Sequence, residues 1–195
     1  GLPPIPIAMS AVGPAMLRVA GEVADGVRLH PFSTRRYLQE ASLVRIGEGL
    51  ERSGRMRSDI EVVSGAFVAT GARNEAVAKM REYIRFRIAF YCSTRAYWHV
   101  LRLHDMEELG EKLRPLPAQG RWDEMAAMIS DDVVELFAVV GTHDEIGAKI
   151  ADLYGGLADT LSLFIPTDTD PGPLREVARD IQRIPTPFTG YKSEW

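Results

Sequence analysis

Short apolar runs alternate with helical patterns along the chain, and this alternation constrains the fold more than any other feature of the sequence. The runs typical of strands are 5–9, 27–30, 60–70 and 160–165. The helical patterns cover 15–23, 35–51, 74–90, 144–153 and 171–184. Strands that are separated by helices predict an α/β fold with a parallel sheet and right-handed crossovers.

Two helix starts carry capping signals, and two segments fall outside the alternation. Thr34 can cap the second helix, and Thr142 with Glu145 has the spacing of a capping box. Between 93 and 136 the pattern breaks into several short helical stretches, which predicts a helical insertion. The segment 185–195 contains two prolines and is expected to be an extended tail.

The length of the chain limits how its four predicted strand–helix units can be used. They suit either a small open sheet or half of an eight-stranded barrel. A complete barrel of this type needs about 250 residues, whereas this chain has 195 and spends part of them on the insertion. We therefore predict one domain over 1–184 with about four parallel strands, and we exclude a complete barrel.

Composition excludes several classes of protein. The 23 basic and 27 acidic residues give a net charge of -4, so no general electrostatic attraction to nucleic acid is expected. No apolar run approaches the roughly 20 residues of a membrane span, and no signal-peptide pattern is visible. Cys92 is the single cysteine, which excludes an internal disulfide and a multi-cysteine zinc site. We expect a cytoplasmic protein that binds neither membranes nor metal.

The exit of the first predicted strand is the sharpest local feature. The segment Ala8 to Gly13, made mainly of small residues, leads directly into a helix with Pro14 in its first turn. Free backbone N–H groups and the positive end of the helix dipole meet at such a turn, and small side chains let a phosphate approach. A plain strand-to-helix turn is the alternative, because no glycine-rich fingerprint and no P-loop lysine are present.

Longer segments resemble the luciferase-like monooxygenase family, and most of all its branch that uses the deazaflavin coenzyme F420. The main segments are Pro4–Pro14, Leu17–Val27 (which contains the fairly specific stretch Ala-Gly-Glu-Val-Ala-Asp-Gly) and Leu29–Phe32. Supporting segments are Phe67–Gly71, Arg85–Tyr91, Ser130–Val134 and Val140–Thr142. The resemblance extends to about Ile184 and covers only the C-terminal half of the family fold.

This resemblance implies the C-terminal half of a (β/α)8 TIM barrel in a flavin- or deazaflavin-dependent oxidoreductase. F420 is the implied cofactor, and FMN is the alternative. The family holds the cofactor phosphate at the helix after its fifth strand, which corresponds here to the backbone N–H groups of Ala11, Val12 and Gly13. In the family, the first four strands supply much of the ring pocket, so no catalytic residue is assigned.

Some polar residues are candidates for ligand contacts. His30 falls at the end of the second predicted strand and could contact substrate or cofactor, or it could be a hydrogen-bonded loop histidine. Arg28 points to the same face and needs a partner or an exposed edge. A group of arginines could bind an anion or form an ordinary solvated helix face: Arg81, Arg85, Arg87 and Arg95.

Two functions from different classes follow. The first is hydride transfer between coenzyme F420 and an unknown small organic substrate, with this chain as the phosphate-binding half. The second is a truncated, non-catalytic half barrel that acts as an assembly or binding module. A half barrel has unpaired edges and an exposed inner face. We therefore expect either a longer parent protein or a homodimer, and no redox activity from the segment alone.

Overall fold

The computed structural model describes residues 4–163 and 171–191, and within them the chain forms a five-stranded parallel sheet. Four strands lie in sequence order: β1 (Ala8–Ala11), β2 (Gly26–Leu29), β3 (Glu61–Gly71) and β4 (Ala138–Thr142). The fifth strand, β5 (Thr160–Leu163), pairs with β3. Every pair is parallel, which confirms the α/β fold predicted from the alternation.

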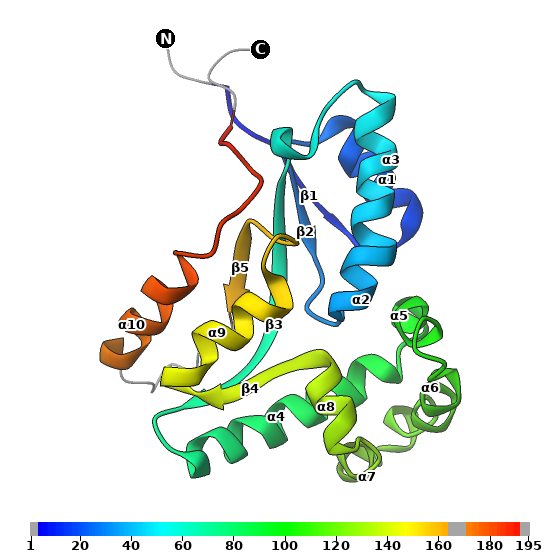
Figure 1. Ribbon diagram of the computed structural model, residues 1–195. Helices are drawn as coiled ribbons and strands as arrows, with labels where there is room; N and C mark the ends of the chain where they lie inside the picture. The colour runs from blue at the N-terminus through cyan, green and yellow to red at the C-terminus, as the bar shows by residue number, and fades with distance from the viewer. Residues whose placement is uncertain (1–3, 164–170, 192–195) are drawn as a thin grey trace.

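The long strand β3 joins two parts of the sheet. Its first half pairs with β2 over 61–64 and with β5 over 63–66, and its second half pairs with β4 over 67–71. In Figure 1, β3 runs from the level of β1 and β2 down to β4. The four predicted strands did not include β4. Its residues directly follow the helix Asp131–Phe137 with no turn between them, so the sequence gives no boundary between helix and strand.

The first strand lies later than predicted, at 8–11 instead of 5–9. Pro6 has no N–H to donate to a ladder. The N–H of Ile7 donates to the Asp25 carboxylate at 2.8 Å, and the ladder begins with Ala8 opposite Gly26. The side chain of Ile5 is 87% exposed, so apolar character here did not indicate burial.

Helices α1 (Pro14–Val23) and α3 (Leu43–Arg52) lie side by side over one face of the sheet (Figure 1). A Cβ at Gly21 would lie 2.1 Å from the Ile46 carbonyl oxygen, and one at Gly49 would lie 2.0 Å from the Arg18 carbonyl oxygen. These glycines therefore permit the close crossing. The predicted helix 35–51 consists of α2 (Arg35–Tyr37), a π-helical segment (Leu38–Ser42) and α3.

A second group of helices lies beyond the end of β2 and carries its own apolar core. It begins with α4 (Asn74–Cys92). The stretch 93–136, expected as an insertion, carries short helices: α5 (Trp98–Arg102), α6 (Glu107–Leu113), α7 (Trp122–Ala127) and most of α8 (Asp131–Phe137).

The last helices pack together beside β5. They are α9 (His143–Tyr154), which begins with the predicted capping box, and α10 (Pro171–Ile181). Residues 164 and 165 of the predicted strand 160–165 lie outside the described part of the chain. The tail returns to the sheet, where the N–H of Phe188 donates to Asp159 at 3.1 Å.

The two faces of the sheet differ in chemistry. Val27 and Val62 point to the helical face and are fully buried. The opposite face, called here the inner face, carries small and polar residues that are exposed: Ala8, Ser10, Arg28, Thr160 and Ser162. Arg28 therefore lies on an exposed surface, as its position in the strand required. Among the described helices, none is long and apolar enough to cross a membrane.

Candidate functional site

The carboxyl ends of β1, β2 and β5 lie at the same end of the sheet. Ala11 at the end of β1 is opposite Leu29 at the end of β2, and Leu163 of β5 is opposite Ala66. Helix α4 lies beyond this end, in the lower part of Figure 1. Because barrel enzymes build their sites at the carboxyl ends of their strands, this end is the candidate site.

A cavity of about 360 Å³ lies at this end of the sheet. Its lining combines residues from β2, β3, α4 and β5, among them Arg28, Gly65, Phe67, Tyr83, Arg87 and Ser162. Pro31 closes over β3, since a Cβ at Gly65 would lie 2.8 Å from its Cδ. The cavity is largely apolar with a few polar groups, which is typical of sites for small molecules.

The predicted phosphate cradle lies at the exit of β1, away from this cavity. Ala11 is buried, whereas Val12 and Gly13 are half-buried. Gly13 is the N-cap of α1, and no side chain caps the helix. A Cβ at Gly13 would meet nothing within 4 Å, and Ala15 and Met16 in the first turn are exposed. The geometry therefore leaves room for an anion at this helix end.

The other side of this turn is packed. A space of only about 20 Å³, room for one water, separates Ala11 and Val12 from His30 and Tyr97. Burial lowers the pKa of the nearby His99 more than its hydrogen bond with the Val12 backbone raises it. An anion could approach only from the exposed side, in front of Gly13.

His30 is held in place by its neighbours. Its Nδ1 accepts a hydrogen bond from the N–H of Phe32 at 3.1 Å, and its ring lies 4.5 Å from the Tyr91 ring and 4.4 Å from the Tyr97 ring. Burial first, and the charge of Arg87 second, lower the pKa of His30 from 6.5 to about 4. The imidazole is therefore neutral at pH 7, with its proton on Nε2. This is the geometry of a hydrogen-bonded loop histidine; a contact with substrate or cofactor stays a prediction.

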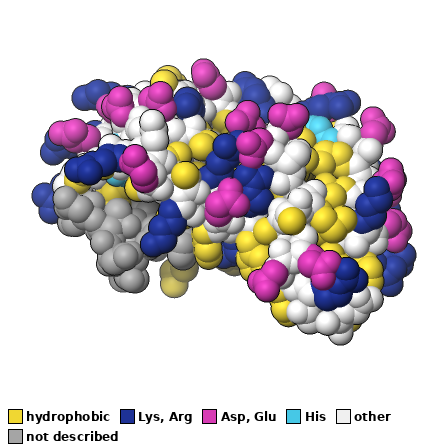
Figure 2. Space-filling view, turned by 90° about the horizontal axis from the view of Figure 1, so that it is seen from below, with side chains coloured by type: hydrophobic (Ala, Val, Ile, Leu, Met, Phe, Trp, Pro, Cys, Tyr) yellow, Lys and Arg dark blue, Asp and Glu magenta, His cyan; other side chains and the backbone are white. Residues whose placement is uncertain are grey.

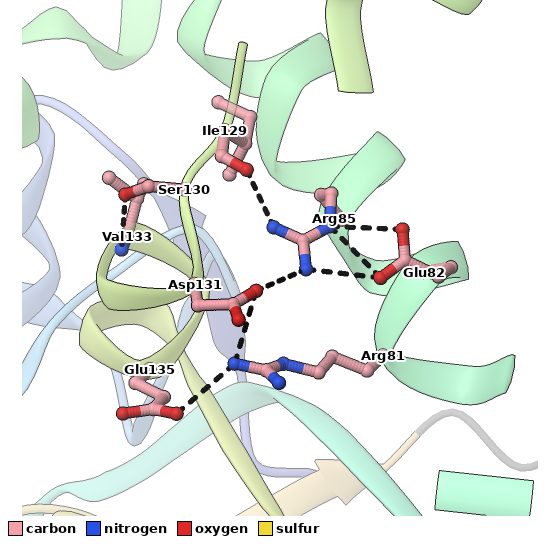
Figure 3. A network of polar contacts seen from close by, with 8 residues as sticks. All are labelled: Arg81, Glu82, Arg85, Ile129, Ser130, Asp131, Val133 and Glu135. Carbon is pink, nitrogen blue, oxygen red and sulfur yellow. Dashed lines mark hydrogen bonds and ion pairs between the residues drawn. The ribbon is translucent and has the colours of Figure 1, made fainter. Parts of the chain in front are cut away.

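The arginines of α4 divide into two kinds, and Figure 3 shows the first. Arg85 donates to Glu82, to Asp131 at 2.5 Å and to the Ile129 carbonyl oxygen at 2.6 Å. Arg81 pairs with Asp131 and with Glu135 at 3.1 Å. These two arginines bind the start of α8 to α4 and have their charges compensated.

Arg87 is the second kind. Its guanidinium donates to the hydroxyl oxygens of Tyr83 and Tyr91, each at 3.0 Å, and lies 5.9 and 5.6 Å from their ring centroids. Within the described residues no carboxylate lies at ion-pair distance from Arg87 or Arg28. Arg95, in contrast, lies over Trp98 and 4.0 Å from Glu111. The structure thus separates Arg87 from the other arginines of the predicted group.

Charges elsewhere on this side are mixed. Figure 2 shows the molecule from below, and on its described surface Lys and Arg side chains alternate with Asp and Glu. The alternation agrees with the ion pairs of Arg81 and Arg85. A charge without such compensation, like that of Arg87, is therefore unusual in this region.

Two other potentially reactive side chains, His104 and Cys92, are hydrogen-bonded or buried. His104 shares a hydrogen bond of 2.8 Å with the Thr34 hydroxyl. Cys92 is fully buried, and burial raises the pKa of its thiol to about 12, which keeps the thiol protonated. Within the described part of the chain, no group of three or more His, Cys, Asp or Glu side chains is arranged to hold a metal ion.

Sequence reasoning missed the way in which Arg87 is held. Tyr83, Arg87 and Tyr91 are four residues apart, and this spacing places all three on one stripe of α4. The signal was available in the sequence. This spacing does not by itself indicate a ligand site, because the same spacing occurs on ordinary solvated helices; the cavity is what gives it meaning.

Comparison with known sequences gives one family and several relatives. The sequence matches the luciferase-like monooxygenase family over residues 1–160. It is 41% identical over 164 residues to an uncharacterized protein of Mycobacterium tuberculosis, and the match covers 83% of this chain and 48% of that protein. It is 27% identical over 150 residues to the 5,10-methylenetetrahydromethanopterin reductase of Archaeoglobus fulgidus, covering 76% of this chain and 45% of the reductase.

The fold is similar to that of the coenzyme F420-dependent tetrahydromethanopterin reductase from Methanopyrus kandleri. The TM-score is 0.70 and the sequences are 24% identical, over 92% of this chain and 50% of that chain. This likeness confirms the predicted fold class, a partial TIM barrel. The chain spans about half the length of the relatives that it matches.

Proposed function

The chain belongs to the luciferase-like monooxygenase family, and we propose that it is the cofactor-phosphate-binding half of an F420-dependent oxidoreductase. The enzyme would transfer a hydride between coenzyme F420 and a small organic substrate. The similar Methanopyrus kandleri reductase, which depends on F420, supports F420 over the alternative FMN. When bound, a deazaflavin supplies hydride transfer and reacts poorly with oxygen, which favours a reductase or dehydrogenase over an oxygenase.

The open, uncapped N-terminus of α1 is the observation that carries this proposal. Among the described residues, no side chain accepts from the N–H groups of its first turn, and no atom lies within 4 Å of a Cβ placed at Gly13. Val12 and Gly13 would contact the phosphate through their backbone. Ala11 would contribute less, because it is buried and pairs with Leu29 in the ladder. The helix dipole would add to the attraction.

His30 has a supporting part in the proposal. It lies next to Ala11 and Val12, across the small space described above. As a neutral imidazole with its proton on Nε2, it could donate a hydrogen bond without adding a charge. The contacts of the imidazole ring with the rings of Tyr91 and Tyr97 would keep the orientation of that donor fixed.

A fluorescence titration of the chain with F420, and separately with FMN, tests the proposal. Gly13→Asp places a negative charge at the helix end and should weaken F420 binding about tenfold. Gly13→Asn is the matched control, because Asn and Asp cap helices about equally well and the space at Gly13 accepts either. Failure of the chain to bind either cofactor would refute the proposal. We expect no turnover from the chain alone.

A second candidate is the non-catalytic module. The exposed inner face of the sheet favours it, since a polar but uncovered sheet face suits a binding surface. A homodimer would be one way to cover that face, and sedimentation analysis distinguishes it from a monomer. Location in the cytoplasm stays a prediction from the composition.

A further inference from the structure

Arg87 presents an uncompensated positive charge to the cavity at the carboxyl end of the sheet. Its two holding groups, the phenols of Tyr83 and Tyr91, are neutral and fix its position without cancelling its charge. A guanidinium has five N–H donors, and these bonds occupy only part of them. The charge of Arg87 also acts on His30. It is the second cause of the lowered pKa of that imidazole, and burial is the larger cause.

Arg28 is a second arginine at the same cavity, and its charge also acts on the Tyr191 hydroxyl that donates to Glu61. It comes from the inner face of β2, whereas Arg87 comes from α4, so the two guanidinium groups enter from different elements. Within residues 4–163 and 171–191, Arg28 also has no carboxylate at ion-pair distance. Two cations at one cavity repel each other, and an anion that binds there relieves this repulsion.

The rest of the lining is apolar and matches an organic body rather than a small inorganic ion. Phe67, Ile84 and Leu163 line the cavity, and Gly65 and Ser162 add small surfaces. The volume of about 360 Å³ lies within the range of about 300–1,000 Å³ that small-molecule sites occupy. An apolar chamber with two guanidinium groups fits a molecule that has an apolar body and one oxyanion.

We propose that this cavity binds an anionic organic substrate, a carboxylate or a phosphate ester with an apolar body, through Arg87 and Arg28. The assignment of this anion as the substrate rests on the proposed function, whereas the binding of an anion in the cavity does not. Arginine suits this task because its planar fork can donate two parallel hydrogen bonds to a carboxylate or phosphate. No other part of the described site offers a guanidinium group without a carboxylate partner.

The coenzyme phosphate is the other source of an oxyanion, and its place differs. The proposed phosphate site consists of Val12 and Gly13 at the start of α1, and neither lines this cavity. One anion site at each place gives the coenzyme and the substrate separate anchors. We therefore assign the cavity to the substrate.

Binding of 4-fluorobenzoate and of its neutral analogue 4-fluorobenzamide to the chain, followed by fluorine NMR without cofactor, tests the proposal. The benzoate should bind more tightly than the benzamide. Arg87→Gln and Arg28→Gln should each weaken the benzoate at least about tenfold and leave the benzamide unchanged. Arg81→Gln is the matched control on the same helix and should change the benzoate affinity less than about twofold.

Equal affinities for the two probes, or a benzoate affinity that Arg87→Gln leaves unaltered, would overturn the proposal. If Arg87→Gln does not fold, as judged by circular dichroism, Arg87→Lys and Arg28→Gln decide the question. Arg87→Lys keeps the charge but loses the fork, so it should retain part of the affinity.

Repeating the titration with saturating F420 distinguishes the two sources of the anion. Unchanged benzoate affinity supports the substrate assignment, whereas competition, together with weaker F420 binding by Arg87→Gln, overturns it in favour of the coenzyme. Because the benzoate experiment needs no F420, a failure of F420 to bind would refute the proposed function and leave this anion site standing. Equally, a failure of benzoate to bind would refute the anion site and leave the proposed function standing.

Discussion

The two ends of the parallel sheet are built in opposite ways. At the amino end, the Asp159 carboxylate is 2% exposed and accepts hydrogen bonds from Val62 N–H and Arg57, both at 2.7 Å, and from Phe188 N–H. At the carboxyl end, Arg28 and Arg87 face a cavity without a carboxylate partner in the described residues. Charges are compensated at one end and left open at the other.

This difference shows which end stabilises the fold and which end can bind a ligand. Asp159 binds to Val62 in β3, to Arg57 in the segment that precedes β3 and to Phe188 in the tail. These contacts contribute to folding. An uncompensated arginine contributes little to folding and is available to a ligand. The contrast agrees with barrel enzymes, in which the amino end serves stability and the carboxyl end serves chemistry.

The largest expected effect is at the amino end. Asp159→Ala removes the acceptor of three hydrogen bonds. It leaves the Val62 N–H without its partner and leaves Arg57 its bond to the Ile60 carbonyl oxygen, which together should lower the free energy of unfolding by about 3 kcal/mol. Urea unfolding measures the change. Asp152→Ala, an exposed carboxylate on α9, should change stability by less than about 0.5 kcal/mol. Similar losses in both variants would contradict the special role of this end.

The next effect concerns the helical layer that spans both ends. Gly49→Ala places a methyl group against the Arg18 carbonyl and should cost about 2 kcal/mol of unfolding free energy. Gly47→Ala, two residues away on α3, meets nothing within 4 Å and should stabilise by about 0.5 kcal/mol, because alanine favours helices. Thermal unfolding of the pair checks the sign, and equal signs would show that the helices do not cross at Gly49.

A smaller effect is expected on β2, where neighbouring residues face opposite sides. Arg28→Gln should change the free energy of unfolding by less than about 0.5 kcal/mol, because its side chain is exposed. Val27→Ala, one residue earlier and fully buried, should cost about 2 kcal/mol. A large loss from Arg28→Gln would mean that the carboxyl end also depends on its charges for stability.

The last prediction is a pH dependence at His30, which has no effect at neutral pH. Its pKa is lowered from 6.5 to about 4 in the folded chain, so between these values the unfolded chain binds a proton that the folded chain does not. The contribution of His30 to stability is therefore complete above pH 6.5 and is lost as the pH falls toward 4. His30→Gln should reduce the pH dependence of urea unfolding in this window. Proton NMR should show the His30 pKa rising in Arg87→Gln, and a pKa near 6.5 in the unaltered chain would contradict the burial of the ring.

The sequence predicted the fold well where the periodic pattern was long. Three of the predicted strands and the capping box at Thr142 lie where expected, within one or two residues at the boundaries that the structure describes. The first strand was misplaced, because the apolar Ile5 and Ile7 flank a proline that cannot join a ladder. Strand β4 was missed, because its pairing with the far half of β3 is not local.

The candidate site was predictable only in part. The turn at Val12 and Gly13 and the position of His30 at the end of β2 followed from local pattern and family resemblance. The cavity did not, because it combines β2, β3, α4 and β5, which are far apart along the chain. The predicted group of four arginines could not be divided from sequence, since the acidic partners Asp131, Glu135 and Glu111 come from other helices.

The sequence by itself determined the alternation of strands and helices and the family, because periodicity and short motifs are local properties of the chain. Only the tertiary structure decided which charges have partners. It brought Asp131 and Glu135 of α8 to Arg81 and Arg85 but left Arg87 between two tyrosines at a cavity. An ion pair depends on distance in space, and distance in space between remote segments is set by packing.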